Sequence, residues 1–320
     1  MITMPKFLVA ILATLFCLLS ISCHRQTESP SSQPTVALVL KTLNNPFFID
    51  MQKGALQAAS QAGVRLTVQA AEREVDVEKQ MQIIENLIQS KVSALCVTPS
   101  GSREIVPAIV KANRAGIPVV ILDTRVHPQT LQEAGGKVAS FIGSDNFEGG
   151  KLAGEFIVKK LGGTGKVAVL EGIPGHETGD SRLKGFHAAV DTHPGMQVVA
   201  SQPANWERDQ GYNVFQNILQ SQPQVQALFA CSDLMALGAV EAIAAAGKTG
   251  KISVVGFDAF LEAREAVLKG AMDATIAQSP SEMGRLAIEN AALLLRGGKV
   301  PEEVSVKIEL ITKENAAEKK

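Results

Sequence analysis

The sequence has few aromatic residues, few cysteines and no excess of either charge. Of its 320 residues, 12 are Phe, one is Trp, one is Tyr and four are Cys. Four cysteines are too few for a disulfide scaffold. With 31 Lys and Arg against 32 Asp and Glu and no basic block, the chain lacks the concentrated positive charge that binding to nucleic acid requires. We therefore expect neither a disulfide-rich protein nor a nucleic-acid partner.

Motifs of metal binding and catalysis are also missing. The five histidines show no metal-ligand spacing, and there is no Gly-x-Ser-x-Gly nucleophile elbow. Gly247-Lys248-Thr249 is similar to the end of a phosphate loop, but residue 242 is Ala where that loop needs Gly. We expect no metal, no cofactor and no enzymatic activity.

Residues 1–22 have the features of a secretory signal peptide. An almost unbroken apolar run extends from Phe7 to Leu19, which is shorter than the ~20 apolar residues that span a bilayer. Cys23 follows, as in the lipobox of bacterial lipoproteins, which this segment resembles although Ser20 stands where Leu is usual. We expect Cys23 to be lipidated; ordinary cleavage between Ser20 and Cys23 is the alternative.

The polar, Pro- and Ser-rich segment 23–34 is typical of a flexible tether. The protein would then be exported, and would be periplasmic or at the cell surface, held to a bacterial membrane by its lipid anchor only. Cys17 would leave with the signal. Cys96 and Cys231 fall in different predicted domains, so we expect buried core residues rather than a disulfide.

The rest of the chain alternates short apolar runs with longer stretches of helical period, and its length suits two domains. Near-continuous apolar runs are typical of parallel strands buried on both faces, with the helices as crossovers. The predicted strands are Thr35–Leu40, Arg65–Val68, Ala94–Val97, Pro118–Leu122, Ala139–Ile142, Lys166–Leu170, Gln197–Ser201, Ala227–Ala230, Ile252–Val255 and Ala274–Ala277.

The predicted helices fill the gaps between these strands. They are Ile49–Ala62, Val77–Gln89, Glu104–Ala115, Glu148–Leu161, Leu183–Asp191, Asp209–Gln220, Leu234–Ala246 and Glu262–Lys269, with a last one at Glu282–Arg296. Gly63, Gly116, Gly162 and Gly247 each stand where a glycine favours the end of a helix. Ten strands are too many for one ordinary sheet, so we expect an α/β fold with two doubly wound parallel-sheet lobes.

In such sheets a ligand binds at the carboxyl ends of the strands. Amides, carboxylates, a guanidinium and aromatic rings follow the predicted strands. The segments are Lys41 to Phe48, Thr98-Pro99, Asp123 to Arg125, Ser144 to Asn146, Glu171-Gly172 leading to Arg182, Ala204 to Trp206, Cys231 to Asp233, Phe257-Asp258 and Gln278 to Pro280. Planar polar groups suit sugar hydroxyls, and aromatic rings cover the apolar faces of a sugar. This set predicts a sugar site.

Each of these residues also has a purely structural interpretation. Lys41 would be a solvated charge, the Phe residues core, and Trp206 a surface residue. Asp123, Asp258, Asn146, Thr98 and Ser232 would cap the helices that follow them. Asp123 and Asp258 would also suit a glycosidase pair, but a nearby Arg182 would keep one or both ionised, which does not suit a general acid. Only the convergence of the whole set favours binding.

Several motifs in fixed order resemble the ribose/allose branch of the periplasmic sugar-binding proteins, with the allose subgroup as the nearest type. These proteins are the substrate receptors of ABC importers, and the similarity extends from about Thr35 to about Thr312. The motifs are Lys41 to Phe48, Leu122-Asp123, Ser144 to Asn146 with Gly149-Gly150, Arg182 with Gly185, Ser201 to Trp206, Gly256 to Asp258 and Ala277-Gln278.

The resemblance implies a role for each matching residue. Hydrogen bonds to the sugar would come from Asn45, Asp123, Arg182, Asp258 and Gln278. Phe48 and Trp206 would sandwich the ring, and Phe47 and Phe257 would line the cleft.

Other positions bear on the subgroup. Lys41, Trp206, Pro99 and the long segment 125–137 are similar to the allose subgroup. Ser232 departs from it, because both subgroups use Asn there, and Phe48 stands where the allose receptor has Trp. A pyranose is therefore expected, without its exact identity.

The resemblance also implies the domain layout. The N-terminal lobe would comprise residues 35–143 and 279–307, and the C-terminal lobe residues 144–278 and 308–320. Three chain crossings, at Gly143/Ser144, at Gln278/Ser279 and near Lys307, would form a hinge. A sugar that contacts both lobes would favour the closed form, which the membrane permease would recognise.

The leading hypothesis is a monomeric, lipid-anchored substrate receptor of an ABC sugar importer. One alternative is a sensor whose closed form docks on a chemoreceptor or a sensor kinase. Others are the effector domain of a sugar-responsive repressor and a protein with enzymatic turnover. Replacing Asp123 or Arg182 by Ala is expected to abolish binding with little loss of fold, because a charge in a cleft serves a ligand rather than the core.

Overall fold

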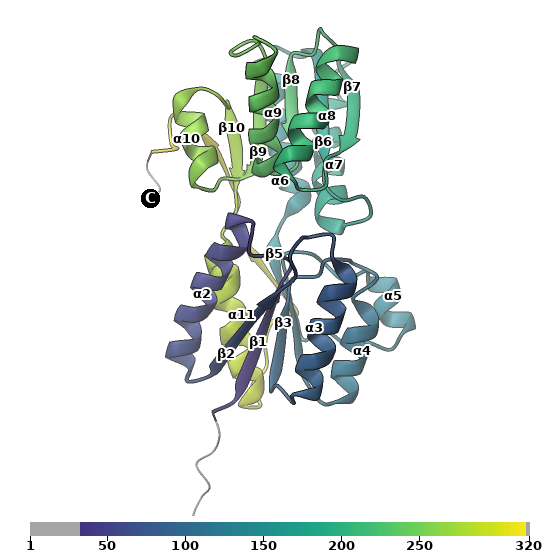
Figure 1. Ribbon diagram of the computed structural model, residues 1–320, viewed down its shortest axis with the longest axis vertical. Coiled ribbons are helices and arrows are strands. Elements are labelled where there is room, and N and C mark those ends of the chain that lie inside the picture. The colour runs from purple at the N-terminus through teal and green to yellow at the C-terminus, as the bar shows by residue number, and fades with distance from the viewer. Residues whose placement is uncertain (1–32, 318–320) are drawn as a thin grey trace, which may run out of the picture. The chain divides into compact units, whose positions relative to one another are not determined.

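The computed structural model describes residues 33–317 of the chain (Figure 1). Residues 1–32, and with them the predicted signal peptide and the lipidation site at Cys23, lie outside the described part. Helices and strands alternate along it as the sequence predicts.

The strands are β1 (Thr35–Leu40), β2 (Arg65–Ala70), β3 (Ala94–Val97), β4 (Val119–Leu122), β5 (Ser140–Ser144), β6 (Thr164–Glu171), β7 (Gly195–Pro203), β8 (Ala227–Ala230), β9 (Ser253–Asp258), β10 (Ala274–Ala277), β11 (Glu303–Val306) and β12 (Glu309–Thr312). The helices are α2 (Pro46–Ala62), α3 (Val77–Gln89), α4 (Val106–Arg114), α5 (Pro128–Glu133), α6 (Asn146–Lys160), α7 (Glu177–Val190), α8 (Arg208–Ser221), α9 (Asp233–Ala245), α10 (Leu261–Lys269) and α11 (Pro280–Leu295).

The strands form two six-stranded sheets, which confirms the predicted α/β fold with two lobes. The first sheet has the order β11-β5-β4-β3-β1-β2, and all of its neighbouring strands are parallel. The second has the order β12-β10-β9-β8-β6-β7 and is parallel except for its edge strand β12, which is antiparallel to β10.

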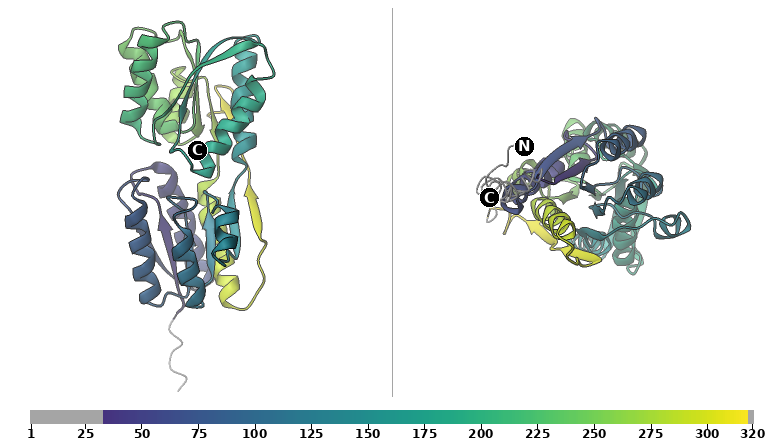
Figure 2. Two further views of the ribbon diagram at one scale, coloured as in Figure 1. Left: turned by 90° about the vertical axis from the view of Figure 1, so that its right-hand side faces the viewer. Right: turned by 90° about the horizontal axis from the view of Figure 1, so that it is seen from below.

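The chain passes between the two sheets three times. It leaves the first sheet after β5, returns after β10 through α11, and leaves again between β11 and β12. Figure 2 shows β11, in yellow, at the edge of the sheet that holds the N-terminal strands. The helix α11 packs against α2, although more than 200 residues separate them in sequence.

Helices cover both faces of the first sheet, which explains why its central strands β1, β3 and β4 are almost continuously apolar. In β1, the side chains of Val36, Leu38 and Leu40 pack in a core with α2 and α11. Ala37 and Val39 alternate with them and pack on the other face with α3 and α4. Because both faces are buried, each residue of the strand has to be apolar.

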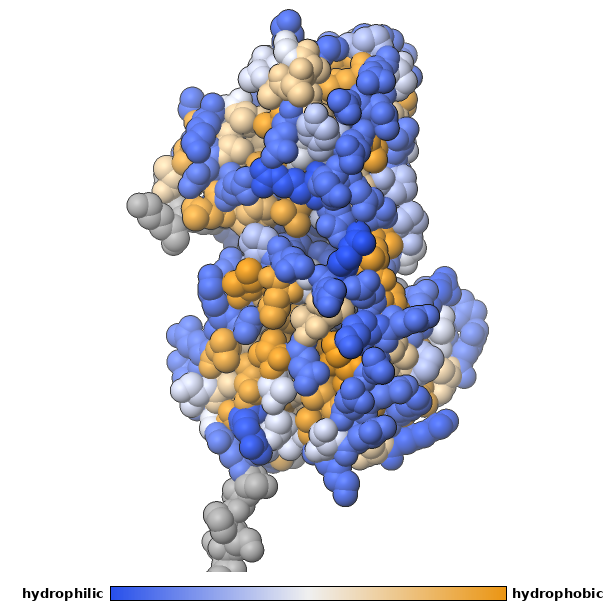
Figure 3. Space-filling model, in the orientation of Figure 1, coloured by the Kyte–Doolittle hydropathy of each residue, from blue (hydrophilic) through white to orange (hydrophobic). Residues whose placement is uncertain are grey.

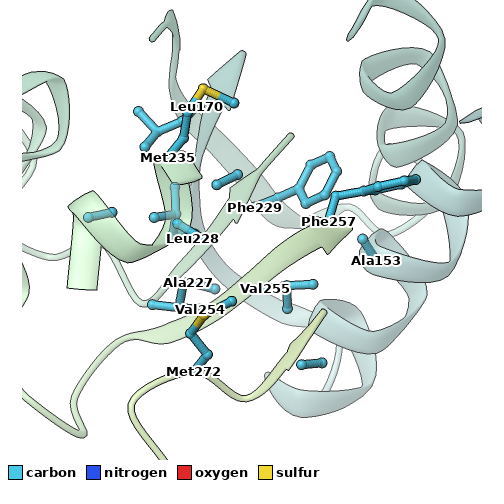
Figure 4. Close-up of a cluster of buried hydrophobic side chains, with 14 of the residues drawn as sticks. Ala153, Leu170, Ala227, Leu228, Phe229, Met235, Val254, Val255, Phe257 and Met272 are labelled. Carbon is cyan, nitrogen blue, oxygen red and sulfur yellow. The ribbon is translucent and has the colours of Figure 1, made fainter. Parts of the chain in front are cut away.

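The second sheet has one contiguous core, part of which is drawn in Figure 4. It includes Phe229 of β8, whose ring stacks on that of Phe186 of α7 with the ring centroids 5.0 Å apart. Cys231 is buried in this core, whereas Cys96 is buried in the core of the first sheet. The expected burial of both thiols is confirmed.

The predicted helix ends are also confirmed. Gly63, Gly116, Gly162 and Gly247 have φ values of 68°, 73°, 65° and 64°, the left-handed conformation in which glycine avoids a steric cost. The helix α5 was not predicted, nor were β11 and β12. These two strands lie at sheet edges and are only partly buried, so they lack the apolar run that marks the others.

Hydrophilic side chains cover most of the face drawn in Figure 3. Within the part of the chain that the structure describes, no helix is both long and apolar enough to cross a membrane.

Candidate functional site

Residues from both sheets line a cavity whose empty space, including the part open to solvent, is about 310 Å³. Each lining residue lies at or beyond the carboxyl end of a strand, the position that open α/β sheets use for ligands. The lining comprises Lys41, Asn45, Phe47, Phe48, Glu74, Asp123, Thr178, Arg182, Trp206, Ser232, Asp258 and Gln278.

Most of the predicted site residues are thus brought together, but two are not. Phe257 is fully buried in the core of the second sheet, where its ring occupies the space that a side chain at Gly149 would take. Pro99 lies in the buried loop between β3 and α4 and does not line the cavity. Glu74 and Thr178 line it although the sequence did not single them out. Glu74 follows the edge strand β2, and Thr178 lies in the first turn of α7, so neither directly follows a core strand.

Lys41 lies in a buried network of charges at the end of β1. Its Nζ donates to Asp123 Oδ2 at 2.9 Å and to Thr124 Oγ1 at 2.8 Å. Glu74 Oε2 is 3.8 Å from the same ammonium group. Because Lys41 is only 2% exposed, the alternative that it is a solvated surface charge is wrong.

Asn45 joins the start of α2 to this network. Its Oδ1 accepts from the backbone N–H of Phe47 at 3.0 Å and so caps the helix, and its Nδ2 donates to Glu74 Oε1 at 3.0 Å. Phe47 and Phe48 follow, with their rings edge to face and their centroids 5.3 Å apart. The helix cap therefore fixes where both aromatic rings enter the cavity.

Arg182 of α7 is the corresponding charge on the other side of the cavity. Its Nε donates to Asn146 Oδ1 at 2.9 Å, and its Nη1 donates to the carbonyl oxygen of Cys231 at 2.7 Å. The guanidinium carbon lies 3.7 Å from the centroid of the Phe257 ring. Phe257 does not line the cavity itself, but its ring packs against the guanidinium group of Arg182, which does.

Asp258 lies beside this guanidinium, with its Oδ1 3.8 Å from Arg182 Nη1 and accepting from Gln278 Nε2 at 2.8 Å. Burial nevertheless raises the pKa of Asp258 to about 7, since the opposing effect of Arg182 is smaller. The guanidinium thus offsets only part of the effect of burial at Asp258, and the expectation that Arg182 keeps one or both of Asp123 and Asp258 ionised stays a prediction. Desolvation outweighs one cation that is too distant for a hydrogen bond.

The ring of Trp206 is 5% exposed and lies against two glycines. A Cβ atom at Gly172 would be 1.9 Å from Cζ2 of the indole, so only glycine at position 172 admits the ring. Ser232 caps α9, because its Oγ accepts from the backbone N–H of Met235 at 3.4 Å, and it also lines the cavity. The structural interpretation of Ser232 is thus confirmed, alongside its place in the lining.

Strained backbone marks the cavity as well. Asp123, Trp206 and Asp258 have φ values of 62°, 68° and 118°, which side chains other than glycine rarely adopt. Such residues persist where the surrounding structure holds them, and they cluster at functional sites. Nothing in the local sequence pattern indicates this strain.

The cavity thus combines two cationic groups, three carboxyl groups, two amides and three aromatic rings. Groups of this kind can donate to and accept from hydroxyl groups while rings cover an apolar face. No group of His, Cys, Asp and Glu with the arrangement of a metal site occurs among the described residues.

Residues 36–299 match the family described as periplasmic binding protein domain. The ribose import binding protein RbsB of Haemophilus influenzae is 41% identical over 89% of this chain and 94% of its own length. The D-allose-binding periplasmic protein of Escherichia coli is 38% identical over 82% of this chain and 85% of its own.

A solved structure of a periplasmic solute binding protein is also similar to this chain. An ABC transporter periplasmic solute binding protein from Actinobacillus succinogenes, determined with bound D-allose, superimposes with a TM-score of 0.85. It is 40% identical in sequence, and the match covers 90% of this chain and all of that one.

Proposed function

This chain belongs to the periplasmic binding protein family, and on that premise we propose that it is the sugar-binding component of an ABC importer. The observation that carries the proposal is a cavity lined from both sheets by charged, amide and aromatic side chains. A sugar in it would contact both lobes, and those contacts would stabilise the closed form relative to the open one.

We propose that the ligand is a monosaccharide of the ribose or allose type, bound as a pyranose. The names of the relatives support this sugar class. Asn45, Asp123, Arg182, Asp258 and Gln278 would form hydrogen bonds with its hydroxyl groups, and Phe48 and Trp206 would cover its two faces. The buried Lys41, held by Asp123, would place a positive charge at one end of the cavity.

Titration of the protein with D-allose, D-ribose, D-psicose, D-galactose and D-glucose tests this proposal. Trp206 is the only tryptophan and lines the cavity, so its fluorescence reports on occupancy, and calorimetry gives the affinity. We expect one or two sugars to saturate the response and to be recovered chemically unchanged. Absence of binding across the panel, or turnover of the sugar, would overturn the proposal.

A second experiment tests the transport role. Deleting the gene should abolish uptake of, and growth on, the sugar that the protein binds, and a plasmid copy should restore both. Unchanged uptake in the deletion strain would argue against an importer and for a sensory role.

We propose the following layout for the chain: a signal peptide at 1–22, a lipid-anchored tether at 23–34, an N-terminal lobe of 35–143 and 279–307, and a C-terminal lobe of 144–278 and 308–320.

Lipidation predicts that the Cys23→Ser variant moves from the membrane fraction to the soluble exported fraction and no longer incorporates labelled palmitate. The same partition in both proteins would show that Cys23 is not the anchor. We expect the exported protein to be a monomer.

A further inference from the structure

Glu74 is a charged residue in the cavity to which the sequence motifs assign no role. It lies in the loop between β2 and α3, at the carboxyl end of an edge strand. Its side chain lines the cavity, and the residue is only 7% exposed. A carboxylate so deeply buried carries a desolvation cost, and burial indeed raises the pKa of Glu74. Its position therefore needs an explanation.

One of its two oxygens lacks a hydrogen-bond donor among the described residues. Oε1 accepts from Asn45 Nδ2 at 3.0 Å. The nearest cation to Oε2 is Lys41 Nζ at 3.8 Å, which is beyond hydrogen-bond length. That ammonium group already donates to Asp123 and Thr124. No described residue donates to Oε2, and this oxygen is not one of the sealed side-chain atoms that lack a partner, so it is accessible to a donor group on a ligand.

The charges around the cavity indicate what kind of donor fits. Glu74, Asp123 and Asp258 supply three carboxyl groups, and Lys41 and Arg182 supply two cations. An anionic ligand group beside Glu74 would be repelled by the carboxylates of Glu74 and Asp123. A neutral hydroxyl group can donate to Oε2 without adding charge, and hydrogen bonds to ionised acceptors are the stronger ones.

We propose that Glu74 is a further binding residue, which accepts a hydrogen bond from one hydroxyl group of the sugar through Oε2. The inference rests on the proposed sugar-binding function and adds one contact to it. Asn45 and Lys41 hold the carboxylate from two directions, so its free oxygen presents a fixed acceptor. The residue thereby selects sugars whose hydroxyl group lies at that point.

The test compares Glu74→Gln with the wild type by calorimetry. The amide oxygen keeps the bond from Asn45, whereas the NH₂ group replaces Oε2 and turns the acceptor into a donor. We expect D-allose or D-ribose, whichever binds the wild type, to lose about ten- to a hundredfold in affinity. Glu72→Gln is the matched control, because it removes the same charge from an exposed residue of the same loop and should leave the affinity unchanged.

Monodeoxy analogues of that sugar identify the hydroxyl group. The analogue that lacks the hydroxyl group read by Glu74 should bind the wild type weakly, yet should lose little further affinity in Glu74→Gln. The other analogues should lose as much as the parent sugar does. This non-additivity is the signature of a direct contact. Equal losses for all analogues would overturn the proposal, because Glu74 would then act only by holding Lys41 and Asn45.

The other outcomes are equally distinct. Wild-type protein that binds no neutral monosaccharide would refute the proposed function itself. Wild-type binding that Glu74→Gln leaves unchanged would refute only the role of Glu74. If Glu74→Gln fails to fold by its melting curve, Glu74→Asp keeps the charge and withdraws the oxygen by one methylene, and the same analogues apply.

Discussion

Arg182 shows how one side chain serves both the fold and the cavity. From the sequence we expected its replacement by Ala to abolish binding with little loss of fold. In the structure it donates to Asn146 and to the carbonyl oxygen of Cys231, and it packs on the ring of Phe257. Removing it leaves buried acceptors without a donor. The expectation for stability is therefore revised, whereas the expected loss of binding stays a prediction.

We predict that Arg182→Ala loses stability even without sugar. Each buried acceptor that water does not reach costs about 1–3 kcal/mol, so the free energy of unfolding in urea should fall by about that amount or more. Lys184→Ala is the control, since Lys184 is exposed on the same helix and should leave stability unchanged. Equal stability of Arg182→Ala and the wild type would restore the original expectation.

Asp258 makes stability depend on pH. Burial raises its pKa to about 7 in the folded protein, against an ordinary value near 3.9 in the unfolded chain. The folded state therefore binds a proton that the unfolded state has released. This contribution is fully present below about pH 4 and is lost as the pH rises through 7.

We predict that Asp258→Asn reduces the loss of stability between pH 5 and pH 8. The buried neighbour Asp233, whose pKa is raised by burial and by the charge of Asp258, changes in the same direction and strengthens the effect. Urea unfolding of ligand-free protein at both pH values measures it. The exposed control Asp209→Asn should keep the wild-type slope. If Asp258→Asn keeps that slope too, Asp258 is ionised in the folded protein at both pH values.

At the scale of elements, glycines let pairs of helices approach closely. A Cβ atom at Gly150 of α6 would lie 1.9 Å from the carbonyl oxygen of Arg182 in α7, and one at Gly185 of α7 would lie 1.9 Å from that of Phe147 in α6. Both contacts are with backbone atoms, which cannot rotate away. The packing of α6 on α7 thus sets the position of Arg182.

We predict that Gly150→Ala destabilises the fold and weakens sugar binding together. Overpacking against side chains costs about 1–3 kcal/mol, and a clash with backbone should cost at least as much. Gly247→Ala is the comparison, because its Cβ would meet nothing within 4 Å and only the φ of 64° is unfavourable. It should cost about 1–2 kcal/mol and leave the affinity unchanged. If Gly150→Ala keeps the stability and the sugar affinity of the wild type, α6 and α7 can move apart without cost.

At the scale of the whole molecule, polar contacts join the two lobes beside the cavity. Arg73, which follows β2, lies with its Nε 3.3 Å from Glu207 Oε1 at the start of α8. The hydroxyl groups of Thr124 and Thr178 are 2.8 Å apart, and the backbone N–H of Glu177 donates to Ser102 Oγ at 3.3 Å. These contacts would be lost if the lobes separated, so they would favour the closed form that we propose for the bound state.

We predict that charge reversal at this ion pair weakens sugar binding by disfavouring closure. The pair is partly exposed and therefore weak, so Arg73→Glu or Glu207→Arg should each lower the affinity by about two- to fivefold at low salt. The double variant Arg73→Glu with Glu207→Arg should recover most of the loss. High salt should reduce the differences in sugar affinity between these variants and the wild type. If the losses of affinity in the two single variants instead add up in the double variant, the two charges act separately.

The local pattern was sufficient to predict most of the strands and helices and the residues that follow them. Buried parallel strands such as β1, β3, β8 and β10 are apolar at nearly every position and stand out from their surroundings, so their bounds were predicted to the residue. The edge strands β11 and β12 were missed, because each is only four residues long, partly exposed and without an apolar run. Predicting the carboxyl ends of strands was enough to find most of the cavity lining.

The sequence by itself thus determined the alternation of elements, the two sheets and the residues available at the strand ends, because each depends on local periodicity and on the geometry of parallel sheets. Only the tertiary structure decided which of them meet. The ring of Phe257 is directed into the core instead of the cavity. Glu74 lies beside Lys41, although 33 residues of sequence separate them. Burial raises the pKa of Asp258. Burial, side-chain direction and the distance between charges depend on how separate segments pack, and no local pattern encodes that.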